Sequence, residues 1–183
     1  MWLLPIYIAM LRGINVGGKK IVRMENLRAS FEALGFGRVK TYVQSGNVIF
    51  EVPKTSSDDL SRTIAEKISK DFGFPIPVVV RTSDEIGKIV GGNPFLKERG
   101  LDSSKLHITF LAAPPAKNAK ERIDALNAGP DQFRIRGREI YLYCPDGYGR
   151  TKLSNNAIEK ALSVGATTRN WKTVSTLARI SSE

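Results

Sequence analysis

Apolar and polar residues alternate with a changing period along the first 81 positions. Runs that are wholly apolar, or that alternate every second residue, are typical of strands, whereas apolar residues three and four apart are typical of a helix. Together with the Ser45-Gly46-Asn47 turn, these runs predict the order β-α-β-β-α-β, which is the ferredoxin-like motif. The predicted strands are Leu3–Leu11, Arg38–Gln44, Val48–Val52 and Ile76–Arg81. One predicted helix carries the apolar residues of 27–34 and ends at Gly35, and a second is capped by Ser57 and stopped by Gly73.

The same order returns about 100 residues further along. Between the halves, Thr82 and Glu85 form a capping-box pair for a short helix through Val90. We predict an α+β fold with two ferredoxin-like subdomains in one compact body, plus a C-terminal helix, divided into residues 1–81, a helix and linker over 82–104, and residues 105–183. The later predicted strands are Lys105–Ala112, Gln132–Arg136, Glu139–Cys144 and a very short Ala166–Arg169, with helices over 117–127, 153–163 and after an Asn170 cap.

Strand parity in the second half predicts which side chains share a face, because successive side chains point in opposite directions. We expect His107, Tyr141 and Tyr143 on the face where RNA-recognition sheets of this topology stack bases. The basic-Gly-aromatic signature of those sheets is absent, and the alternative is that the other half or the terminal helix covers this face. The same parity places Cys144 on the opposite face from His107, which argues against a cysteine-histidine nucleophile.

Composition excludes several classes of protein. The longest apolar run, Trp2 to Leu11, is too short to cross a bilayer and lacks a basic leader or cleavage site. Cys144 is the only cysteine and His107 the only histidine, so neither an internal disulfide nor a multi-ligand Cys/His metal site can form. We expect a cytoplasmic protein with no membrane association, no metal and no cofactor.

The net charge of +10 is concentrated toward the two ends of the sequence. Residues 1–24 hold four bases and no acid, and residues 147–182 hold six bases against Glu159 alone, whereas the middle holds 18 bases and 16 acids. Two basic ends favour an anionic partner such as a phosphate ester, nucleic acid or an acidic protein surface. The other interpretation is that the lysines are simply solvated.

Four loops combine basic or amide side chains with glycines or with a helix start; one of them is Gln44–Asn47, which crosses the first hairpin. In the first loop, Arg12–Lys20, glycines let backbone amides approach an anion. The loops Gly147–Lys152 and Thr167–Trp171 each precede a helix, where free amides favour negative charge. We expect the first loop, the first hairpin and the last turn to border one anion-accepting surface. The candidate ligand-binding residues are Arg12, Asn15, Gly17, Gly18, Lys19, Lys20, Gln44, Ser45, Asn47, Arg150, Lys152, Arg169 and Asn170.

Three separated motifs follow one another in these regions: RGINVGG after the first strand, YVQSGNVIF at the first hairpin and TTRNWKTV near the end. Over essentially the whole chain they resemble the bacterial domain-of-unknown-function 1697 family. The resemblance implies a cytoplasmic α+β protein with two ferredoxin-like subdomains. It implies no reaction and no catalytic residues, because the family is named for having none assigned.

The preferred functional hypothesis is binding of a phosphate-bearing small molecule or nucleic acid through the basic loops. The alternative is a small enzyme acting on a phosphorylated metabolite, with Arg12, Asn15, Gln44 and Asn47 as positioning groups. The sequence contains no P-loop, seryl elbow or dinucleotide fingerprint to support that alternative. A third hypothesis is a protein-interaction module.

Overall fold

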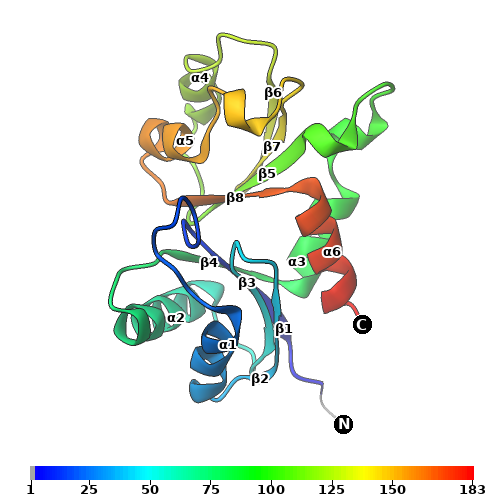
Figure 1. Cartoon of the computed structure of the whole chain (residues 1–183). Helices are drawn as coiled ribbons and strands as arrows, with labels where there is room; N and C mark the ends of the chain where they lie inside the picture. Colours follow the sequence, from blue (N-terminus) through cyan, green and yellow to red (C-terminus); the bar gives the residue numbers. More distant parts are fainter. Residues whose placement is uncertain (1–2) are drawn as a thin grey trace. The chain divides into compact units, whose positions relative to one another are not determined.

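In the computed structural model, which describes residues 3–183, the chain forms two compact units (Figure 1). The first unit comprises residues up to Gly87 together with 177–183, and the second comprises 88–176. Each contains one four-stranded antiparallel sheet with helices, so the predicted α+β fold with two similar subdomains and a C-terminal helix is confirmed. Within residues 3–183, no helix has the length and apolar character that a membrane span requires.

The sheet of the first unit has the strand order β2-β3-β1-β4. One of its faces packs on α1 and α2, where Phe31 and Ile64 meet Phe50 and Leu11, all four at most 1% exposed. Ser56 caps the N-terminus of α2, because its hydroxyl accepts a hydrogen bond from the backbone N of Asp59. The elements are β1 (Ile6–Leu11), α1 (Met24–Ala33), β2 (Gly37–Tyr42), β3 (Asn47–Glu51), α2 (Ser57–Phe72), β4 (Val78–Thr82) and α3 (Ser83–Gly91).

The sheet of the second unit repeats this arrangement with the order β6-β7-β5-β8. Ile123 of α4 and Ile158 of α5 pack with Leu111 and Leu142 of the sheet. The elements are η1 (Pro94–Lys97), η2 (Ser103–Lys105), β5 (Leu106–Leu111), α4 (Ala119–Asp124), β6 (Gln132–Arg136), β7 (Glu139–Tyr143), η3 (Tyr148–Arg150), α5 (Asn155–Leu162), β8 (Ala166–Asn170) and α6 (Trp171–Ser181).

In both units the fourth strand runs directly into a helix. Thr82 and Glu85 form the predicted capping box: the Thr82 backbone N donates to Glu85 Oε2 at 2.8 Å, and the Glu85 backbone N donates to Thr82 Oγ1 at 3.1 Å. Asn170 caps α6, where its Oδ1 accepts from the backbone N of Thr173 at 2.8 Å. The boundary between the two units falls within both helices, since α3 ends at Gly91 and α6 begins at Trp171.

Several elements differ in length from the sequence-based expectation; β1, for example, begins at Ile6 rather than at Leu3. β8 is a full strand over Ala166–Asn170, because all of its residues pair with β5. The helix expected over 117–127 covers only Ala119–Asp124.

Candidate functional site

The loop after β1 is a short β-hairpin rather than an open cradle. The Asn15 backbone N donates to Lys20 O at 3.1 Å, and the turn residues Gly17 and Gly18 have φ of 59° and 72°. Both turn positions of a type I′ hairpin require positive φ, which glycine adopts without steric cost. The two glycines are therefore explained by the turn, and residues 16–21 project from it; we call them the basic tip.

Asn15 fixes the base of the basic tip. Its Nδ2 donates to the backbone oxygens of Val22 at 2.9 Å and Gln44 at 2.8 Å, and its Oδ1 accepts from the Val22 backbone N at 2.8 Å. Its φ is 54°, in the left-handed region that asparagine tolerates better than most residues. These contacts use the whole side-chain amide, so Asn15 is a positioning residue and not the free ligand donor that the sequence suggested.

Gly46 brings the β2–β3 hairpin against the same loop. Its backbone oxygen accepts from the Leu11 backbone N at 2.9 Å, and its φ is 85°. A Cβ at this position would lie 2.5 Å from Ile14 Cδ1. The first loop and the first hairpin therefore meet, as expected from the sequence, through backbone contacts that only glycine permits.

Asn47 does not belong to the exposed part of this hairpin, which corrects its assignment as a ligand-binding residue. It is 0% exposed, and its Nδ2 donates to Tyr42 O at 3.0 Å and to Ser45 Oγ at 3.1 Å. The side chain closes the turn from inside. The side chains of Gln44 and Ser45 remain exposed.

The basic tip exposes aliphatic side chains together with its lysines. Val16 is 66% exposed and Ile21 60%, and Lys19 and Lys20 are both exposed. Lys20 Nζ donates to the Pro75 backbone oxygen at 3.4 Å. The lysines are predictable from the sequence as surface residues, whereas the exposure of the two aliphatic side chains is not, because valine and isoleucine are usually buried.

Arg169 is buried, which corrects its placement in an exposed turn. It lies in β8, is 7% exposed, and its Nη1 donates to Thr167 Oγ1 at 2.7 Å and Thr168 O at 3.1 Å. Burial lowers the pKa of Arg169 to about 10. Arg81 of β4 occupies the corresponding position, opposite Ile8 and 1% exposed. A buried arginine in the fourth strand is thus a structural feature of both units.

The helix start after Gly147–Lys152 is already capped. The backbone N of Asn155 donates to the Tyr148 hydroxyl at 2.8 Å, and that of Ala157 donates to Ser154 Oγ at 3.3 Å. Arg150 and Lys152 are exposed. The amides expected to attract an anion here are satisfied by side chains of the same unit.

The register between β5 and β7 contradicts the prediction that His107, Tyr141 and Tyr143 share one face of the sheet. His107 lies opposite Leu142, and Ile108 lies opposite Tyr141, so His107 and the tyrosines are on opposite faces. Tyr141 is 3% exposed and its hydroxyl donates to Ile89 O at 3.2 Å. A base-stacking surface of the RNA-recognition type is therefore absent from the described part of this sheet.

The same register places Cys144 and His107 on the same side of the sheet, contrary to the sequence-based expectation. Cys144 is 0% exposed, and burial raises the pKa of its thiol to about 11. A thiol in this state is a poor nucleophile. Residues 3–183 contain no cluster of three or more His, Cys, Asp or Glu side chains able to hold a metal ion.

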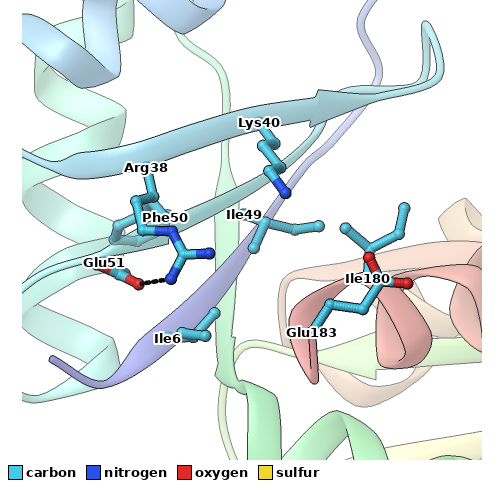
Figure 2. A pocket seen from close by; sticks show the side chains of 8 residues that line it. All are labelled: Ile6, Arg38, Lys40, Ile49, Phe50, Glu51, Ile180 and Glu183. Atoms are coloured by element: carbon cyan, nitrogen blue, oxygen red, sulfur yellow. Dashed lines mark hydrogen bonds and ion pairs between the residues drawn. The ribbon is translucent and has the colours of Figure 1, made fainter. Parts of the chain in front are cut away.

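A small hollow lies on the first unit beside the edge strand β2. Figure 2 shows Ile6, Ile49 and Ile180 along the hollow, together with the ion pair of Arg38 with Glu51. Arg38 Nη1 lies 2.9 Å from Glu51 Oε1. Its volume is about 20 Å³, enough for about one water molecule. The hollow is too small for a metabolite.

A family model described as a protein of unknown function, DUF1697, matches residues 4–141. The chain belongs to the DUF1697 family. No curated protein matches this DUF1697 chain. It is similar to the solved structure of a conserved bacterial protein from Streptococcus pneumoniae, with a TM-score of 0.74 and 20% identity over 97% of this chain and 98% of that one. At this identity the likeness establishes the fold alone.

Proposed function

We propose that the protein binds a polyanion, with nucleic acid as the first candidate, through the basic tip and the neighbouring β2–β3 hairpin. The supporting observation is a hydrogen-bonded hairpin that exposes Lys19 and Lys20 in a stretch of 24 residues without any acid. Phosphate contacts by such lysines supply most non-specific nucleic-acid affinity. Cys144 is the only cysteine, and it is buried with a raised thiol pKa. A lone buried thiol is compatible with the reducing cytoplasm, where nucleic acid is present.

The tip is better suited to binding than to acid-base catalysis. Between Arg12 and Arg23 the sequence contains no acid, histidine or cysteine. The bonds of Asn15 anchor the base of the tip to Val22 and Gln44, and such preorganisation reduces the entropy that binding must offset. This segment therefore supplies no carboxylate, imidazole or thiol that could act as a general acid or base, as an enzyme acting on a phosphorylated metabolite would need.

The test measures affinity for a short DNA duplex and a single strand across a salt series. Each lysine-phosphate contact contributes a slope of about −0.9 in log K against log salt on duplex DNA. The double variant Lys19→Ala/Lys20→Ala is expected to reduce the magnitude of the slope by about 2. The matched control is Lys97→Ala/Lys117→Ala, which removes two exposed lysines and the same charge from the other unit.

Equal slopes for the tip variant and the control contradict the proposal, as does an absence of binding at low salt. Both variants should keep the stability of the unaltered chain within about 0.5 kcal/mol, because the substituted side chains are exposed.

A second candidate function is docking to an acidic protein surface. It is favoured by the exposed aliphatic side chains of Val16, Ile21 and, on the hairpin, Val43, which is 43% exposed. Aliphatic contacts of this kind are typical of protein interfaces. Failure to bind either oligonucleotide would favour this function over the first.

A further inference from the structure

The second unit contains a groove of about 600 Å³ between η2 and the beginning of α6. Ser103 and Ser104 line it from η2. His107 of β5 and Asn170 of β8, which pair with each other in the sheet, also line it. The volume lies within the range of small-molecule sites.

The first two turns of α6 provide the remaining lining. Trp171 and Ser175 are four residues apart and share one stripe of the helix, and Lys172 and Thr176 share the next. The helix therefore brings an indole ring, one exposed ammonium group and two hydroxyls to the groove. The Thr176 hydroxyl donates to Lys172 O at 2.8 Å, and its oxygen retains the capacity to accept.

His107 is held in place but is not fully satisfied. Its ring stacks on Tyr148 with centroids 4.6 Å apart. Its buried Nδ1 makes no hydrogen bond of ordinary geometry among the described residues, and the backbone of Lys105 provides only a weak contact that raises the pKa of the ring less than burial lowers it. Burial lowers the pKa of His107, so the imidazole is neutral at pH 7. A buried ring nitrogen without a partner is uncommon and is a place for a water molecule or a ligand group.

A comparable groove in the first unit lacks these properties. It has a volume of about 570 Å³ and is lined by Tyr7, Ser83 and Ser181, among others. The Tyr7 hydroxyl donates to Thr55 O at 2.9 Å, and Ser83 Oγ donates to Ser181 O at 3.0 Å. These polar groups bond to one another within the protein, whereas the groove of the second unit combines a tryptophan ring, an exposed lysine and an imidazole with only a weak backbone contact.

We propose that the groove of the second unit binds a nucleoside monophosphate or a ligand of the same chemistry, a planar ring that carries one anionic group. The ring stacks on Trp171, which is worth about 1–3 kcal/mol for a base on an aromatic side chain. The anionic group pairs with Lys172 and with hydroxyls of the lining. This inference is independent of polyanion binding at the basic tip, because the residues involved belong to different units.

The experiment titrates the full chain with AMP, adenosine and inorganic phosphate. The chain has two tryptophans, so the variant Trp2→Phe leaves Trp171 as the only indole reporter. AMP is expected to quench its fluorescence saturably below about 1 mM. Adenosine is expected to bind about tenfold more weakly, because it lacks the charged group.

The variants locate the site. Lys172→Ala is expected to weaken AMP binding about tenfold and leave adenosine unchanged, since it removes only the ammonium. Lys160→Ala, an exposed lysine of α5 in the same unit, is the charge-matched control and should leave both ligands unchanged. Lys19→Ala/Lys20→Ala should also leave AMP binding unchanged, which separates this site from the tip.

Calorimetry on the unaltered chain repeats the AMP titration without any substitution, so the answer does not depend on the folding of the Trp2→Phe variant. Absence of saturable AMP binding up to about 10 mM overturns the proposal. AMP binding that is equally strong in Lys172→Ala and in the Lys160→Ala control also overturns it.

Discussion

Replacing Asn15 by alanine is expected to destabilise the protein by about 4 kcal/mol. The substitution removes three hydrogen bonds, of 2.8, 2.8 and 2.9 Å, at about 0.5–1.5 kcal/mol each. It also leaves alanine at a φ of 54°, where the left-handed conformation costs about 1 kcal/mol. For a chain of this size the expected fall in Tm is roughly 8–16 °C.

Two further variants separate these contributions. Asn15→Gly loses the same hydrogen bonds but avoids the left-handed cost, so it should be about 1 kcal/mol more stable than Asn15→Ala. Gln44→Ala is the control, because only the backbone oxygen of Gln44 takes part and its side chain is exposed. It should lie within about 0.5 kcal/mol of the unaltered chain.

The assay is urea denaturation followed by circular dichroism, with hydrogen exchange of the Val22 amide as a local measurement. That amide donates to Asn15 Oδ1 and should exchange faster in Asn15→Ala. An Asn15→Ala protein as stable as the Gln44→Ala control would refute the positioning role of this side chain. Asn15 would then be available to a ligand, as the sequence alone suggested.

Two other predictions concern titratable groups in the second unit. His107 should titrate by NMR below its ordinary pKa of 6.5, because burial disfavours the imidazolium. Stability should fall as the pH drops from 7 toward 5, since the unfolded chain takes up a proton that the folded imidazole resists, and His107→Gln should remove this dependence. A titration at or above 6.5 would contradict the burial argument. Cys144 should react with iodoacetamide at pH 8 only when the chain unfolds, because a rise in the thiol pKa from 9.0 to about 11 leaves about a hundredfold less thiolate. Alkylation of the folded protein at the rate of a free thiol would show that the side chain is accessible.

Local signals in the sequence predicted the ends of elements well. The Thr82 and Glu85 capping box and the Asn170 cap both occur as expected, because each depends on side chains within three residues of the backbone groups that they satisfy. The order of strands and helices followed from the same kind of information.

Register between distant strands could not be obtained in this way. β5 and β7 are apolar on both faces, so no alternation distinguishes the core side, and a shift of one residue exchanges the faces. This is why His107 and Tyr141 were assigned to one face, although they lie on opposite faces.

The candidate site was only partly predictable for a related reason. The two consecutive glycines Gly17 and Gly18 are a local sequence signal of a two-residue turn. The burial of Arg169 and Asn47 depends on the three-dimensional neighbours of each side chain, which residue type does not reveal.

The order in which the two units appear along the chain has a consequence for synthesis on the ribosome. Residues 177–183 belong to the first unit, where Ser181 accepts from Ser83 and Ile180 lines the hollow beside Ile6 (Figure 2). The unit that emerges first is therefore the one completed last, after the whole second unit has been translated. Until residues 177–183 are translated, Ile6 and Ser83 lack the partners that this segment supplies, so the first unit cannot complete its packing before the second has been synthesised.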